Sequence, residues 1–67
     1  MNINNTNELG KLVKETRKAQ GLTQADLALS ANVGVRFVVD LESGKETAQI
    51  GKAIQVCKML GLTIEIN

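Results

Sequence analysis

Apolar residues recur along the first third of the chain at the spacing of an amphipathic helix. Leu9, Leu12 and Val13 form one such stripe, and polar residues fill the positions between and around them. Asn5 precedes the stretch and is a good N-cap. The pattern therefore predicts a first helix over about residues 6–20.

Two shorter helices follow in the predicted order of elements. The second begins after Thr23, a residue that caps helices well, and ends near Asn32, which tolerates a positive φ. The third covers about residues 34–43. Residues 22–44 thus have the layout of a helix-turn-helix, in which two helices are joined by a tight turn.

The last third of the chain predicts a fourth helix and then a strand. The helix is expected to start at a cap on Thr47 and to bury a stripe of Ile50, Ala53, Ile54, Cys57 and Leu60. In residues 62–67 apolar and polar residues alternate, and this period of two is typical of a strand. A lone strand leaves its backbone groups unpaired, so it needs a partner. The candidates are the first four residues of the same chain and the same strand of a second copy.

Composition excludes several kinds of site. The chain has 67 residues, which predicts a single small domain over residues 1–67, with one Cys and no His. These counts exclude a disulfide framework, the usual zinc site and the common nucleophile–base pairs. We therefore expect no metal, no cofactor and no enzymatic activity.

Hydropathy and net charge say less about the function of the chain. The sequence has no apolar run long enough for a membrane span and no signal-peptide pattern, which predicts a soluble, cytoplasmic protein with no membrane partner. Eight basic and seven acidic residues leave a net charge of +1. This balance neither favours nor excludes nucleic acid, so the local distribution of charge must decide.

A set of residues at fixed spacing resembles the phage-repressor-like, or Xre-type, helix-turn-helix family. The set comprises Leu22-Thr23-Gln24, Leu27-Ala28, Val33, Val38, Leu41-Glu42 and Gly44. The resemblance implies a mainly α, lambda-repressor-like DNA-binding domain of four to five helices.

A narrower set resembles the HipB-type antitoxins and related regulators. It comprises Val35-Arg36-Phe37, Leu41-Glu42-x-Gly44-Lys45, Thr47-Ala48, Ile50-Gly51-Lys52 and Leu60-Gly61-Leu62. This resemblance implies a homodimer on double-stranded DNA, with a HipA-type kinase toxin as partner. It also implies that the C-terminal strands of two subunits, with Leu62, Ile64 and Ile66, pair across the dyad.

The resemblance also implies which residues contact DNA. They are Gln24, Gly34, Val35, Arg36, Phe37, Val39, Asp40, Ser43 and Lys45. The glutamine that matches Gln24 donates to a backbone phosphate in the family. Arg36, at the exposed start of the third helix, can reach guanine or a phosphate. Ser43 and Lys45 are placed to hold a second phosphate.

Two of these side chains, and Arg17 outside this set, keep alternative interpretations. Phe37 lies either in the groove or at the edge of the core. Asp40 accepts from cytosine, orients Arg36 or is simply an exposed acid. Arg17 forms a partly buried ion pair with Glu42, as in phage-repressor relatives, or is solvated and contacts DNA.

The function predicted from these residues is a sequence-specific, DNA-binding transcriptional repressor. The narrower resemblance makes it the antitoxin of a HipA-type module that represses its own operon. The alternative is a protein-interaction antitoxin that binds a kinase toxin, with DNA binding secondary or absent.

Overall fold

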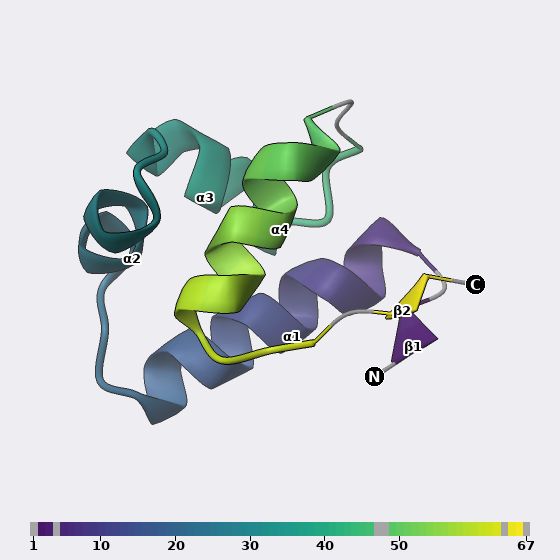
Figure 1. Ribbon diagram of the computed structural model, residues 1–67, viewed down its shortest axis with the longest axis horizontal. Helices are drawn as coiled ribbons and strands as arrows, with labels where there is room; N and C mark the ends of the chain where they lie inside the picture. The colour runs from purple at the N-terminus through teal and green to yellow at the C-terminus, as the bar shows by residue number, and fades with distance from the viewer. Residues whose placement is uncertain (1, 4, 47–48, 64, 67) are drawn as a thin grey trace.

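Four helices occupy most of the computed structural model, which describes residues 2–3, 5–46, 49–63 and 65–66. They are α1 (Thr6–Ala19), α2 (Gln24–Ala31), α3 (Val35–Glu42) and α4 (Ile50–Met59). The long helix α1 lies along one side, and the three shorter helices gather on the other (Figure 1). Helix α3 packs against both α1 and α2, and α4 packs against α2.

Local capping fixes the start and end of α1. The Asn5 side chain accepts a hydrogen bond from the Glu8 N–H at 2.8 Å, so the predicted N-cap is confirmed. The helix ends at Ala19, one residue before the predicted end. Gly21 follows with a φ of +72°, the left-handed conformation that glycine adopts without strain.

The turn between α2 and α3 also forms as its residues predict. Thr23 and Asp26 make a reciprocal capping box, with both hydrogen bonds at 3.0 Å. The hydrogen bonds from Thr23 lower the pKa of the Asp26 carboxyl. Asn32 ends α2 with a φ of 57°, and Gly34 is the N-cap of α3. Both short helices therefore lie where the sequence predicts them.

The core lies between the four helices and draws apolar side chains from each of them. The buried hydrophobic residues are Leu9, Val13, Leu27, Ala28, Ala31, Val38, Leu41, Ala53, Val56, Cys57 and Leu60. Val38 and Leu41 are the inward residues of α3, as predicted. The opposite face of α3 is thereby left for solvent.

The prediction for α4 is wrong in part. The helix begins at Ile50, and the predicted cap Thr47 lies outside the described residues. Ile50 and Ile54 were expected inside but are 52% and 40% exposed, whereas Val56 is fully buried. The physical reason is tertiary packing: α4 lies against α2, and its buried residues Ala53, Val56 and Cys57 share one face of the helix. The buried stripe is therefore displaced around the helix toward Val56.

Two very short strands bring the ends of the chain together. Strand β1 (Asn2–Ile3) pairs in parallel with β2 (Glu65–Ile66), with Asn2 opposite Glu65. Both strands lie at the same end of α1 (Figure 1). The first of the two candidate partners is therefore the one found within this chain, and pairing with a second copy stays a prediction.

The strand region is also shorter than the predicted 62–67. Leu62 precedes β2 and packs against the core instead. Ile64 and Asn67 lie outside the described residues, so the role given to Ile64 stays a prediction as well.

Candidate nucleic-acid interface

The outward face of α3 carries most of the side chains expected to meet DNA. Val35 and Val39 are exposed, and the Arg36 side chain is 85% exposed. Gly34, just before the helix, leaves its surroundings open, since a Cβ there would touch nothing within 4 Å. The first backbone N–H groups of a helix have no partner inside it, so the start of α3 offers donors to solvent.

Asp40 lies between two cations on this face. Its Oδ1 is 3.6 Å from Nε of Arg36, and its Oδ2 is 3.7 Å from Nζ of Lys45. Of the interpretations left open for Asp40, the structure shows the pairing with Arg36 and adds Lys45. Such long, exposed ion pairs are weak and exchange readily with water or other anions. Arg36 and Lys45 are thus held loosely beside one carboxylate.

The end of α3 is closed by Ser43. Its hydroxyl donates to the Asp40 carbonyl oxygen at 2.8 Å, and its backbone N–H donates to the Val39 carbonyl at 3.1 Å. The hydroxyl oxygen still has acceptor capacity, but its proton is used within the helix end. A phosphate contact through Ser43 would therefore require this local hydrogen bond to be exchanged.

Phe37 lies at the edge of the core. It is half-buried and packs against the buried cluster, and Nζ of Lys52 lies 6.0 Å from the centre of its ring. An ammonium group at this distance is within the range of a weak cation–π attraction. Of the two alternatives for Phe37, the structure shows the core edge in the DNA-free chain.

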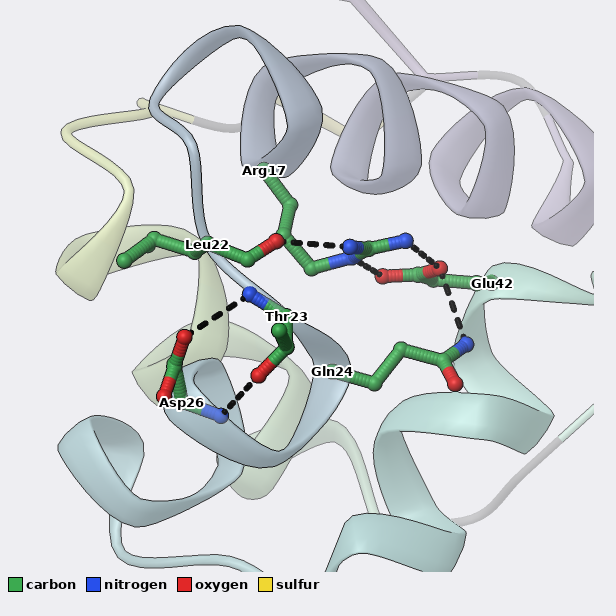
Figure 2. Close-up of polar contacts among 6 residues, drawn as sticks. All are labelled: Arg17, Leu22, Thr23, Gln24, Asp26 and Glu42. Atoms are coloured by element: carbon green, nitrogen blue, oxygen red, sulfur yellow. Dashed lines mark hydrogen bonds and ion pairs between the residues drawn. The ribbon is translucent and has the colours of Figure 1, made fainter.

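The ion pair between Arg17 and Glu42 is present and nearly buried (Figure 2). Nε of Arg17 donates to Oε2 of Glu42 at 2.6 Å, and a second guanidinium N–H donates to Oε1 at 3.0 Å. The two side chains are only 9% and 3% exposed. The hydrogen bond to Glu42 raises the pKa of Arg17, which therefore stays charged. The alternative of a solvated Arg17 is wrong.

Arg17 also reaches the loop before α2, where its Nη1 donates to the Leu22 carbonyl oxygen at 2.7 Å. One guanidinium thus joins α1, this loop and the end of α3. Because an arginine fork has fixed geometry, these contacts fix the position of α3 relative to α1.

Gln24 is joined to the same carboxylate, a contact that the sequence analysis missed. Its Nε2 donates to Oε1 of Glu42 at 3.1 Å (Figure 2). The two residues lie 18 positions apart, and local periodicity carries no signal for such a contact. Gln24 is the first residue of α2, so the link ties the start of α2 to the end of α3.

Gly10 is a second feature that the sequence analysis missed. A Cβ at this position would collide with the Leu41 carbonyl oxygen and would lie 2.8 Å from that of Glu42. Thr6 adds a hydrogen bond from its hydroxyl to the Gly44 carbonyl oxygen at 2.7 Å. The absence of a side chain on Gly10 lets α1 and α3 approach closely, directly behind the exposed face of α3.

Comparison with known proteins agrees with this arrangement. The model of a family described as helix-turn-helix matches residues 13–67, well over half of the chain. The chain belongs to the Xre-like helix-turn-helix family. Members of this family are DNA-binding transcriptional regulators and are typically not enzymes. Helices α2 and α3, which the sequence predicts to form the motif, both lie inside the matched region.

Two relatives show how far the similarity extends. The uncharacterised HTH-type transcriptional regulator y4mF of Sinorhizobium fredii is 56% identical over 59 residues, which are 88% of this chain and 78% of that protein. Human endothelial differentiation-related factor 1 is 42% identical over 40 residues, which are 60% of this chain but only 27% of the human protein. The second likeness therefore concerns about a quarter of a larger protein.

Three further observations concern metal ions, the thiol of Cys57 and membranes. Within the described ranges, no group of three or more His, Cys, Asp or Glu side chains is arranged to hold a metal ion. Cys57 is buried, and burial raises its pKa to about 11, so the thiol stays protonated near neutral pH. None of the described helices has the length and apolar character needed to cross a bilayer.

Proposed function

We propose that this protein is a sequence-specific transcriptional repressor that inserts α3 into the major groove of double-stranded DNA. One observation supports this most strongly. The buried Arg17–Glu42 pair and the close approach at Gly10 fix α3 from behind, while its opposite face is open to solvent. A recognition helix needs this combination, because base contacts require a rigid and accessible side-chain array.

Each exposed residue then has a proposed role. Arg36 donates to guanine or a phosphate, and Val35 and Val39 offer apolar contact to thymine methyl groups. Gln24, Lys45 and the open helix start at Gly34 bind backbone phosphates, with Ser43 beside Lys45. Phe37 supports the recognition helix from the edge of the core. We further propose that this regulator acts in the cytoplasm.

The proposed operator complex contains two copies of the chain. Arg36 and Lys45 are few cations for one interface, and Asp40 offsets part of their charge. Two subunits on half-sites one helical turn apart would double the contacts. Among the described residues β2 belongs to a two-stranded sheet with β1, so its other edge is where the strand of a second copy would add.

A finer proposal is that the regulator is the antitoxin of a HipA-type kinase toxin and represses its own operon. The narrower residue pattern that starts at Val35 and ends at Leu62 supports it. The alternative is an antitoxin that binds the kinase and whose DNA binding is secondary or absent, and it predicts that selection from random duplexes enriches no sequence. Co-purification with the kinase of a neighbouring reading frame supports either antitoxin role, and failure of that complex to form removes both.

Selection of binding sites from random duplexes tests the repressor proposal. At a stated salt concentration, we expect the wild type to enrich a two-fold symmetric sequence. Arg36→Ala should lose the preference at one base pair in each half-site, because that base no longer meets a guanidinium. Lys14→Ala, which removes an equal charge from the exposed side of α1, is the control and should select the wild-type sequence. The proposal fails if the wild type enriches no sequence.

A further inference from the structure

The Glu42 carboxylate is surrounded by donors that hold it in one orientation. Its Oε2 accepts from Nε of Arg17, and its Oε1 accepts from Nη2 of Arg17 and from Nε2 of Gln24. The guanidinium is itself fixed by the Leu22 carbonyl oxygen (Figure 2). The carboxylate therefore has no freedom to turn away from Gln24 without breaking the buried ion pair.

This arrangement determines which end of the Gln24 amide faces inward. A carboxylate only accepts hydrogen bonds, so the NH₂ group and not the carbonyl oxygen must point toward Glu42. That nitrogen carries two hydrogens, and the contact with Glu42 uses one. Because Gln24 is half-buried at the first position of α2, the second hydrogen is the donor left for a ligand at the start of this helix.

Charge explains why the ion pair must be complete. An isolated carboxylate 3.1 Å from the Gln24 nitrogen would repel a phosphate that approached the same amide. The guanidinium of Arg17 neutralises this charge at 2.6 Å. Glu42 can therefore orient the amide without opposing an anion beyond it.

Orientation before binding also affects affinity. A free glutamine side chain samples several rotamers, and a ligand that captures it must overcome that loss of entropy. In this chain the ordering already exists in the DNA-free state. The hydrogen bond between Gln24 of α2 and Glu42 of α3 restricts the glutamine side chain before any ligand binds.

We propose that Glu42 is a positioning residue that holds the Gln24 amide ready to donate to a DNA phosphate, with Arg17 neutralising its charge. This inference rests on the proposed DNA-binding function. It assigns the Arg17–Glu42 pair a role in phosphate contact in addition to its role in holding the fold together.

A double-mutant cycle tests the inference, with the duplex selected by the wild type as the probe. Affinities are measured by fluorescence anisotropy at a temperature at which circular dichroism shows every variant folded. Gln24→Ala should weaken wild-type binding about tenfold, as expected for loss of a hydrogen bond to a charged group. In a Glu42→Gln background the same change should weaken binding by no more than about twofold. Equal losses in both backgrounds would overturn the inference.

Lys45→Ala is the matched control in this cycle. Its proposed phosphate contact does not depend on Glu42, so its loss of affinity should be the same in both backgrounds. A merely structural effect of Glu42→Gln would disturb the contributions of Gln24 and Lys45 alike, and that result would also contradict the inference. If the wild type binds no selected duplex, the proposed function fails and the inference fails with it.

A measurement on the unaltered protein avoids any concern about folding. Nitrogen-15 relaxation of the glutamine side chains should show a restricted Gln24 amide in the absence of DNA. Gln55, which is exposed on α4, is the internal comparison and should be mobile on the nanosecond scale. A Gln24 amide as mobile as that of Gln55 would show that Glu42 does not position it, whatever the affinity of the variants.

Discussion

At the scale of single residues, Asp40 has the most direct influence on the proposed interface. Its carboxylate pairs with both Arg36 and Lys45 beside α3. In the proposed complex, DNA phosphates would compete with this carboxylate for the same cations and would be repelled by its charge. Asp40 should therefore weaken binding to any duplex, and it leaves a larger share of the affinity to base contacts.

We expect Asp40→Asn to strengthen binding to a random-sequence duplex about fivefold at low salt, because one repulsive charge near the phosphates is removed. Fluorescence anisotropy in about 50 mM salt measures the change. Glu15→Gln, which removes a charge from the exposed side of α1, is the control and should change affinity little. Unchanged affinity in Asp40→Asn would show that the carboxylate does not face the DNA.

Loss of Arg17 should strongly reduce the stability of the fold. Arg17→Ala leaves the Glu42 carboxylate buried without its cation, a defect that typically lowers the free energy of unfolding by about 3–5 kcal/mol. Urea denaturation measures the loss. Lys18→Ala, at the next and exposed position, should change the stability by less than about 0.5 kcal/mol. Similar values for the two variants would contradict the buried pair.

The buried thiol of Cys57 should make the free energy of unfolding depend on pH in the alkaline range. Its pKa is about 11 in the folded chain against 9.0 for an unperturbed thiol, so the folded state retains the proton at higher pH. The resulting stability is present in full below pH 9 and is lost as the pH rises toward 11, by about 1.4 kcal/mol per unit. The difference in unfolding free energy between wild type and Cys57→Ala should shrink over this window. A difference that is constant with pH would contradict the assignment.

At the scale of elements, the contact between α1 and α3 determines how α3 is held. Gly10 provides the close approach, the Thr6–Gly44 hydrogen bond lies at one end, and the Arg17–Glu42 pair lies farther along α1. The capping residues explain where α1 and α2 begin. They do not explain how α1 is oriented against α3, because that depends on the surfaces that meet.

Substitution of two glycines separates packing from helix propensity. Gly10→Ala should lower the free energy of unfolding by about 1–3 kcal/mol, because its Cβ collides with backbone oxygens that have little room to move. Gly51→Ala, in α4, meets nothing within 4 Å and should raise stability by up to about 1 kcal/mol through propensity. Thermal denaturation of both variants measures the effects. Stabilisation by both would show that α1 and α3 are not in close contact.

At the scale of the whole molecule, the ends of the chain meet and place β2 at a sheet edge. A chain of 67 residues buries only a modest share of its surface, so association with a second copy would add stability as well as DNA contacts. The exposed Ile50 and Ile54 lie on α4, and Ile54 shares a surface hollow with Leu62 and Thr63. This apolar surface adjoins the segment that leads into β2.

We expect sedimentation equilibrium to show a dimer for the full chain and a monomer after deletion of residues 64–67. This deletion keeps Leu62, which packs against the core, so the helices should remain folded by circular dichroism. Affinity for the selected duplex should fall steeply, because each half-site is then bound alone. A stable dimer after the deletion would contradict pairing through the C-terminal strand.

The sequence by itself determined the local structure of this protein. Asn5, Thr23 and Asn32 were identified from capping and turn chemistry, which depends on neighbours three or four residues away. The inward face of α3 followed from helical periodicity, and the fixed spacing of the motif gave the family. These features can be predicted from the sequence because the interactions that produce them join residues that are close together in the chain.

The tertiary structure alone decided how those elements meet. On α4, which packs against α2, it buried Val56 and left Ile50 and Ile54 exposed. It paired β2 with the start of the same chain and placed Phe37 at the edge of the core. It also joined Gln24 to the Arg17–Glu42 pair and brought Gly10 against α3. Each of these contacts joins residues far apart in the chain, and their geometry depends on the packing of whole helices, which no local pattern encodes.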